Sequence, residues 1–279
     1  MSPEEAYEYA KFHGPSDEIR KIVCKDSEYA YKYAKYVDKK PRDDTRNAAC
    51  KDPKYAYEYA YHIDKKSRTI TRKAACEHAF YAYFYAWNID KKPRNDTRRA
   101  ACRDPECAFL YAQNVDKCPR DDTREAVYED LYWVIEYARY IDKESREDTR
   151  KAACKEPEYA YRYASIIDKE PRENTREAVC EDSDYAYRYA SIIDRCPRDD
   201  TRKAACKDPH FAYKYAEEID KEPREDTREA ACKDLKYACL YAKNVDKGFH
   251  QETWNAIKNT KYEKEYKNFF RRMEKDKII

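Results

Sequence analysis

Apolar residues recur along this chain at the spacing of one helical face. In the segment Lys51–Cys76 they fall at positions i, i+3, i+4 and i+7, as Ala56, Tyr59, Ala60 and Ile63. This spacing is typical of an amphipathic helix whose apolar side faces a core. The pattern predicts a helix over residues 53–63, with small Ala and large Tyr side chains mixed on its inner face.

The polar residues around this stripe indicate where helices begin. Asp52 followed by Pro53 is typical of a helix start, because aspartate accepts hydrogen bonds at the N-cap and proline fits the first helical position. A tight connection follows the stripe, and Asp-Thr-Arg then begins a second, shorter helix in most copies. In the first full copy, Asp44 is the expected N-cap of that helix, and Ala48 and Ala49 lie on its inner side.

The whole pattern returns every 26 residues without a gap. Nine full copies, numbered here as repeats one to nine, follow one another: Lys25–Cys50, Lys51–Cys76, Glu77–Cys102, Arg103–Tyr128, Glu129–Cys154, Lys155–Cys180, Glu181–Cys206, Lys207–Cys232 and Lys233–Lys258. A fixed period of this size is the signature of a solenoid, in which each unit buries its apolar face against its neighbours.

The predicted fold is therefore all-α, a right-handed α-solenoid of about ten 26-residue αα repeats. Residues 1–258 are expected to form the array, with a shortened first repeat over residues 1–24. Residues 259–279 are expected to form a C-terminal capping helix, in which Phe269, Phe270 and Met273 are the apolar residues that close the core.

Composition narrows the classes of function. The 279 residues contain 58 Lys and Arg against 56 Asp and Glu, a balance that argues against a general polyanion binder. Gly14 and Gly248 are the only glycines, so no glycine-rich phosphate loop is present. The sequence has no apolar run of membrane-spanning length and no leader pattern, so we expect a cytoplasmic protein without membrane contact.

Eight of the twelve cysteines end successive repeats: Cys24, Cys50, Cys76, Cys102, Cys154, Cys180, Cys206 and Cys232. Equivalent residues of stacked helices lie roughly 8–10 Å apart, whereas a disulfide needs Cα atoms within about 7 Å. We therefore expect reduced, mostly buried thiols and a reducing compartment. Without a C-x-x-C motif, and with five scattered histidines, no metal site or cofactor is expected.

Several polar positions are the same in nearly every repeat. In the numbering of repeat two, Tyr59, Asp64 and Thr71 recur in all nine full copies, and Arg68 and Arg72 recur in eight. This pattern predicts an ion-pair and hydrogen-bond ladder between successive repeats. The alternative is a row of arginines that binds phosphates. No acid–histidine pair recurs with the spacing of a catalytic site, so we expect no enzymatic activity.

The segment Ala160–Val179, AYRYASIIDKEPRENTREAV, resembles short αα repeats of unknown function found in giant-virus and some bacterial proteins. Its rhythm is also loosely similar to leucine-rich variant repeats, with Tyr and Ala in place of the usual leucines. The resemblance implies a solenoid and no activity or catalytic residue. A viral, host-directed role would follow from it only by analogy.

One stretch of the outward helix face is apolar where the face is otherwise polar. The outward positions of repeats two to five carry six large apolar residues: Tyr61, Phe80, Phe84, Trp87, Leu110 and Tyr132. Together they would form a patch on the order of a few hundred Å², which is typical of an interaction site. We predict a non-enzymatic scaffold that binds a partner protein or a second copy here. The alternative is local packing, since repeat five is itself irregular.

A second candidate surface lies on the connections of repeats one to three. Its basic residues are Lys39, Lys40, Arg42, Lys65, Lys66, Arg68, Lys91, Lys92 and Arg94. Such an edge could follow a nucleic-acid backbone or bind another phosphate ligand. It could equally be a solvated, charged surface. Nucleic-acid or phosphate binding along this edge is the alternative function.

Overall fold

The computed structural model describes residues 1–276, and the side chains of residues 1–269 and of Arg271. The side chains of Phe270 and Met273, and residues 277–279, to which the capping prediction extends, lie outside the described part. Within residues 1–276 the chain is helical and contains no strand. It divides into two compact units, Met1–Lys143 and a second unit that begins at Glu144.

The first unit holds the shortened repeat, repeats one to four and the first helix of repeat five. Its elements are α1 (Pro3–His13), α2 (Asp17–Val23), α3 (Ser27–Tyr33), η1 (Ala34–Asp38), α4 (Asp43–Ala49), α5 (Pro53–Tyr59), η2 (Ala60–Asp64), α6 (Thr69–Ala75), α7 (Ala79–Phe84), η3 (Tyr85–Asp90), α8 (Asn95–Ala101), α9 (Pro105–Tyr111), η4 (Ala112–Asp116), α10 (Asp121–Ala126), η5 (Val127–Glu129), α11 (Leu131–Tyr137) and η6 (Ala138–Asp142).

The second unit holds the remaining repeats. Its elements are α12 (Glu147–Ala153), α13 (Pro157–Tyr163), η7 (Ala164–Asp168), α14 (Glu173–Val179), α15 (Ser183–Tyr189), η8 (Ala190–Asp194), α16 (Asp199–Ala205), α17 (Pro209–Lys214), η9 (Tyr215–Asp220), α18 (Glu225–Ala231), α19 (Leu235–Tyr241), η10 (Ala242–Asp246), α20 (Gln251–Ile257) and α21 (Glu263–Asp276).

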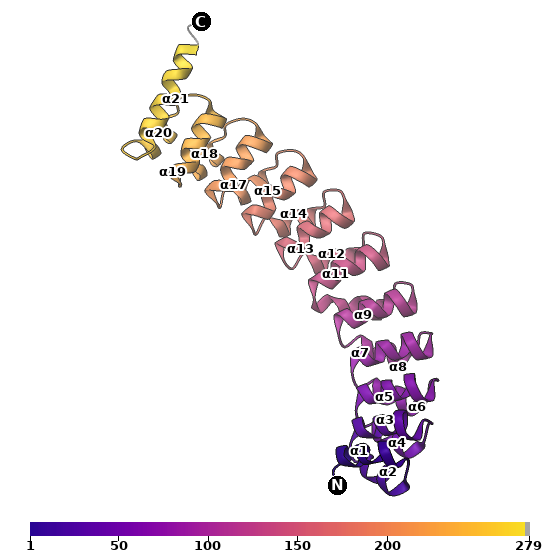
Figure 1. Ribbon diagram of the computed structural model, residues 1–279. Coiled ribbons are helices and arrows are strands. Elements are labelled where there is room, and N and C mark those ends of the chain that lie inside the picture. The colour runs from indigo at the N-terminus through magenta and orange to yellow at the C-terminus, as the bar shows by residue number, and fades with distance from the viewer. Residues whose placement is uncertain (277–279) are drawn as a thin grey trace. The chain divides into compact units, whose positions relative to one another are not determined.

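In each unit the helices alternate between two rows. In the first unit, α3, α5, α7 and α9 lie along one side and α4, α6 and α8 along the other (Figure 1). Within each unit, a full repeat therefore contributes one longer and one shorter helix, stacked on the equivalent pair of its neighbour in that unit. The prediction of an all-α solenoid of 26-residue αα repeats is confirmed.

The first helix of each full repeat ends in a wide π turn, which the apolar spacing did not predict. In repeat two, α5 ends at Tyr59 and continues as the π segment η2 to Asp64, one residue beyond the predicted end. The turn closes with Lys65 in the left-handed conformation, at φ 52°. The same position carries Lys or Arg with positive φ in all nine repeats. A cation there lies next to the carbonyl groups at the helix C-terminus, which favour positive charge.

The predicted N-caps are correct for the first helix and wrong for the second. Asp52 accepts hydrogen bonds from the backbone N–H groups of Lys54 and Tyr55, as expected. In contrast, α4 begins at Asp43, so Asp44 lies inside its first turn and accepts a bond from the Thr45 N–H at 2.8 Å. The residue at the N-cap position is Arg42, whose side chain makes no cap.

A tyrosine of the next repeat supplies the missing cap. The Tyr59 hydroxyl accepts a hydrogen bond from the Arg42 N–H at 3.0 Å and donates to the Arg42 carbonyl oxygen, also at 3.0 Å. It also lies 2.9 Å from the Thr45 hydroxyl. The nine equivalent tyrosines have no exposed surface: Tyr33, Tyr59, Tyr85, Tyr111, Tyr137, Tyr163, Tyr189, Tyr215 and Tyr241.

Buried ion pairs form the second link between repeats. The Arg46 guanidinium lies over the Tyr59 ring and binds both carboxylate oxygens of Asp64, at 2.9 and 2.8 Å. The Asp64 side chain is fully buried, and Arg68 of its own repeat lies 3.0 Å away. The predicted ladder is therefore confirmed for the arginine at the Arg46 position, which pairs with the aspartate of the next repeat. The arginine at the Arg68 position instead contacts the aspartate of its own repeat, as Arg68, Arg94 and Arg224 do, and adds no link between repeats.

One junction departs from this pairing. Arg72 of repeat two binds Asp96 at 2.8 Å, whereas the buried carboxylate of Asp90 is paired with Arg94 at 3.0 Å. The sequence of repeat two explains the difference in part. The position three residues before the arginine is an acid or Asn95 in the other arginine-bearing repeats, and is Thr69 here.

Most of the cysteines are half-buried at the edge of the core, so the prediction that they are mostly buried is wrong. All twelve are free; Cys76, Cys107 and Cys239 are buried, Cys118 and Cys196 are exposed, and the others are half-buried. Loss of solvation raises the pKa of the Cys50 thiol to about 11 and that of Cys76 to about 12. These thiols are therefore protonated near neutral pH and poorly reactive.

Helix α21 closes the core of repeat nine through a residue that the sequence analysis did not single out. Tyr266, which is 1% exposed, packs with Ala242 and Ile257. Its ring lies 5.7 Å from that of Trp254, and its phenol interacts with the Thr253 side chain and the His250 backbone. Tyr266 thus takes the position that a repeat tyrosine takes at every regular junction.

Candidate functional site

The outward side of α7 and of the π segment η3 that continues it carries three aromatic residues at positions that are mostly polar in the other repeats. Phe80 and Trp87 are each 45% exposed, and Phe84 lies half-buried between them. The Phe80 and Phe84 rings are 4.5 Å apart, and the Phe84 and Trp87 rings are 6.0 Å apart. The three side chains therefore form one continuous surface along a single helix.

Repeat two extends this surface. Tyr61 is 47% exposed, and its ring stacks on that of Tyr57 at 5.9 Å. Tyr57 in turn lies 6.1 Å from Phe84 of the next repeat. The structure thus brings four of the six predicted residues into one network of ring contacts. We call Tyr61, Phe80, Phe84 and Trp87 the aromatic face.

The other two predicted residues lie outside this network of ring contacts, although Leu110 packs against the same core cluster as Phe84. Leu110 is half-buried and packs against the core cluster that contains Tyr83 and Tyr111. Tyr132 is 42% exposed, and its ring contacts Trp133 at 5.0 Å, which lies 5.1 Å from Phe109. The ring contacts therefore place Tyr132 with repeats four and five, apart from the aromatic face.

Buried Tyr83 and half-buried Tyr57 support the aromatic face from beneath. The Tyr83 ring stacks on Trp87 at 5.7 Å and an angle of 14°. Its hydroxyl accepts a hydrogen bond from Asn114 at 2.9 Å, as the Tyr57 hydroxyl does from Asn88 at 3.0 Å. These supporting residues were missed as part of the site. The signal for them is that tyrosine recurs at the same repeat position as Tyr57 and Tyr83.

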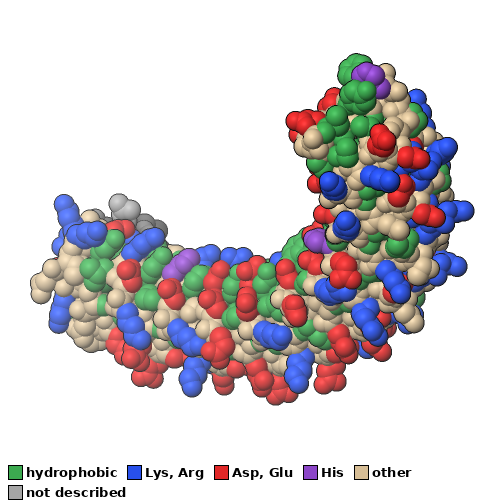
Figure 2. All heavy atoms as spheres, turned by 90° about the horizontal axis from the view of Figure 1, so that it is seen from below, with side chains coloured by type: hydrophobic (Ala, Val, Ile, Leu, Met, Phe, Trp, Pro, Cys, Tyr) green, Lys and Arg blue, Asp and Glu red, His purple; other side chains and the backbone are tan. Residues whose placement is uncertain are grey.

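The basic edge is less basic than its sequence indicates. Arg68 lies 3.0 Å from Asp64, Arg94 lies 3.0 Å from Asp90, and Arg42 lies 3.9 Å from Asp44. All three arginines are thus partly neutralised by acids of the repeat scaffold. The six exposed residues that remain are Lys39, Lys40, Lys65, Lys66, Lys91 and Lys92. Acidic and basic side chains are also interspersed over the face seen in Figure 2.

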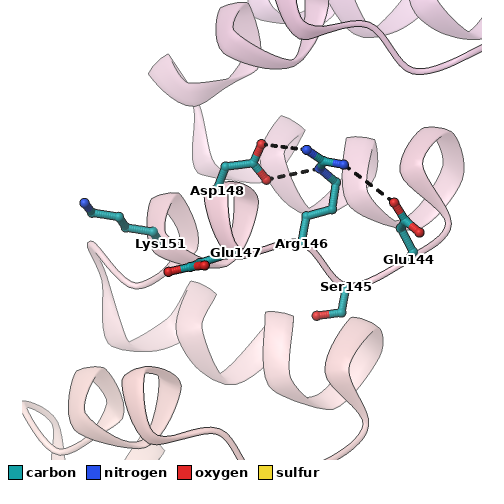
Figure 3. A pocket seen from close by; sticks show the side chains of 6 residues that line it. All are labelled: Glu144, Ser145, Arg146, Glu147, Asp148 and Lys151. Carbon is teal, nitrogen blue, oxygen red and sulfur yellow. Dashed lines mark hydrogen bonds and ion pairs between the residues drawn. The ribbon is translucent and has the colours of Figure 1, made fainter.

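A polar hollow lies at the start of the second unit. Its lining residues are Glu144, Ser145, Arg146, Glu147, Asp148 and Lys151. The Arg146 guanidinium donates to Asp148 at 3.2 Å and lies 3.6 Å from Glu144, so that the three charges are turned toward one another (Figure 3). Because its arginine is already paired with acids, the hollow offers little for an anionic ligand.

Neither a metal centre nor a membrane span was found in the part of the chain that the structure describes. No group of three or more His, Cys, Asp and Glu side chains there is arranged to hold a metal ion. None of the helices searched combines the length and apolar character that crossing a bilayer requires.

Comparison with known proteins adds no relative to this description. No protein-family profile matches the chain, and neither curated proteins nor solved structures give a significant match. The resemblance to giant-virus and bacterial αα repeats remains a prediction.

Proposed function

We propose that this protein is a non-enzymatic repeat scaffold that binds another protein through the aromatic face. The observation that carries the proposal is the cluster of Phe80, Phe84 and Trp87, whose rings contact one another while two of them remain 45% exposed. Aromatic clusters of this kind are characteristic of the energetic centre of protein interfaces.

The energetics favour a partner that covers this face. Burying one such side chain contributes roughly 1.5–3 kcal/mol, so two or three rings together offset much of the entropic cost of association. The stacking of Trp87 on Tyr83 and of Tyr61 on Tyr57 limits the rotation of the exposed rings. A surface that is ordered before binding loses less side-chain entropy when a partner arrives.

The proposal is tested by placing a photo-crosslinking amino acid at position 87 in otherwise unchanged protein. After irradiation in an extract of the source organism, we expect one defined crosslinked protein. The matched control carries the same amino acid in place of Lys35, which occupies the equivalent position of repeat one and is polar. Crosslinking at both positions alike, or at neither, would count against a site at the aromatic face.

A second candidate function is nucleic-acid or phosphate binding along the basic edge, supported by the six exposed lysines of repeats one to three. Its test is binding of single-stranded RNA and of inorganic polyphosphate at increasing salt, because phosphate contacts weaken steeply with ionic strength. Lys40→Glu, Lys66→Glu and Lys92→Glu together should abolish such binding. Unaltered binding at low salt would exclude the edge.

A further inference from the structure

In each full repeat a buried tyrosine binds the start of the second helix of the preceding repeat, and we call this binding position the tyrosine seat. The shortened repeat has a tyrosine at the same repeat position that is not bound in a seat. Tyr9 occupies the same repeat position as Tyr59, yet it is 45% exposed whereas Tyr59 is fully buried. Five residues after it stands Gly14, where every full repeat has the buried aspartate of the ladder. Phe12, on the same helix, is 83% exposed.

The second helix of repeat nine forms a tyrosine seat that lacks one residue of the regular seats, the ladder arginine. That helix keeps Thr253 and the cap position, which is His250, but carries Trp254 where the other eight full repeats have the ladder arginine. A regular repeat would bury its aspartate beside this tryptophan without the arginine that pairs with it across a regular junction, which disfavours docking of such a repeat. The seat therefore suits a tyrosine that is not followed by the aspartate.

Among the tyrosines at the junction position of a repeat, or bound at a junction, two meet that condition. One is Tyr266 of α21, which occupies the seat and has Arg271 at the place of the aspartate. The other is Tyr9, with Gly14 at that place. The seat of repeat nine thus lacks the arginine, and each tyrosine that could bind there lacks the aspartate that would pair with it.

A second pair of positions matches in the same way. At four junctions a tyrosine hydroxyl of one first helix bonds a polar side chain of the next, as in Tyr57 with Asn88 and Tyr213 with Asn244. At the corresponding positions repeat nine has Cys239 and the shortened repeat has Phe12. Both members of that pair are apolar, so their contact would bury apolar surface and leave no hydroxyl unpaired.

From these two correspondences we infer that the occupant of the repeat-nine seat, besides α21, is α1 of a second copy of this chain. Tyr9 of one copy binds the His250 backbone and Thr253 of the other, and Phe12 packs on Cys239. The contact joins different surfaces of the two copies, so it propagates head to tail. Helix α21 competes with it, because Tyr266 fills the same seat.

The inference is tested with full-length chains by light scattering. In Tyr266→Glu, a carboxylate cannot remain in the buried seat, so the seat opens and oligomers should grow with protein concentration. Adding Tyr9→Glu to that variant should return it to a monomer. The double variant has an open seat but lacks Tyr9, whereas the unchanged protein has Tyr9 but its own seat is filled by Tyr266. A mixture of the two should therefore give a one-to-one complex.

The control mixture replaces the unchanged protein with the single variant Tyr9→Glu, and the complex should then weaken at least about tenfold, or about 1.4 kcal/mol. Absence of a complex in the first mixture, or an equal complex in the control, would overturn the inference. Hydrogen exchange on the first mixture is the second measurement. Slower exchange in α1 of the unchanged protein is expected, and slower exchange elsewhere only would contradict docking through α1.

Discussion

The hydroxyl group of Tyr59 lies 3.0 Å from both the backbone nitrogen and the carbonyl oxygen of Arg42, the residue that precedes helix α4. A side chain of one repeat thus caps a helix of the repeat before it. Helix caps are usually made by a residue of the same helix. Here the start of each second helix depends on stacking, which couples the folding of neighbouring repeats.

The first prediction is that this hydroxyl matters apart from the ring that carries it. Tyr59→Phe keeps the ring but leaves the Arg42 N–H without its acceptor, and should lower the free energy of unfolding by about 1–3 kcal/mol. Urea denaturation measures the loss. The control is Tyr61→Phe at an exposed position, where a change within about 0.5 kcal/mol is expected. Equal stability of the two variants would show that the cap contributes nothing.

The second prediction separates the regular ion-pair junction from the exceptional one. Arg46→Met leaves the buried Asp64 with only the flanking Arg68, and should cost about 3–5 kcal/mol. Arg72→Met should cost less, roughly 0–1 kcal/mol, because its partner Asp96 is exposed and Asp90 keeps Arg94. Thermal unfolding of both variants gives the comparison, and a larger loss for Arg72→Met would contradict the pairing.

The third prediction concerns thiol reactivity. With pKa values raised to about 11 for Cys50 and Cys180, the half-buried thiols should react slowly with a chromogenic disulfide reagent at pH 8. Cys118 and Cys196 are exposed and should react fast, giving two rapid equivalents. Cys118→Ser with Cys196→Ser should remove the rapid phase, and denatured protein should release all twelve thiols. Many rapid equivalents in native protein would disprove the burial.

The fourth prediction is a loss of stability at high pH. Burial raises the pKa of Tyr59 and of Tyr137 above the value of about 10 that an unfolded chain has. The native state therefore holds these protons more tightly. Their contribution is complete below about pH 10 and is lost as the pH rises toward the folded pKa. Stability measured from pH 8 to 11 should decline, and a flat profile would argue against neutral buried phenols.

The repeats could be predicted from the sequence because period and apolar spacing report directly on helices and stacking. The π turn could not, since Ala56, Tyr59 and Ile63 have the same spacing in an α-helix that ends normally. The N-cap at Asp44 was wrong because local sequence does not show that Tyr59 reaches the helix start from the next repeat. Cross-repeat contacts of this kind exist only in the stacked chain.

The candidate site was predictable in part, because the polar pattern of a helix shows which residues point outward. Polar patterning identified Phe80 and Trp87 as outward residues, and both are exposed. Phe84 and Leu110 also lie at outward positions, but rings of neighbouring repeats partly cover them. The pattern within one helix does not predict such contacts between repeats. For that reason Phe84 also contributes to packing, and a change there combines loss of binding with some loss of stability.

The most direct measurement of the central claim is quantitative capture of partner proteins by the unchanged chain and by a variant with the outward face of repeat one. That variant carries Phe80→Glu and Trp87→Lys, the residues found at the positions of Glu28 and Lys35. The control carries charge reversals at the equivalent positions of repeat one, Glu28→Lys and Lys35→Glu. The account predicts that a specific partner, identified by mass spectrometry, is lost with the first variant and retained with the control. Capture of the same proteins by all three chains would contradict it.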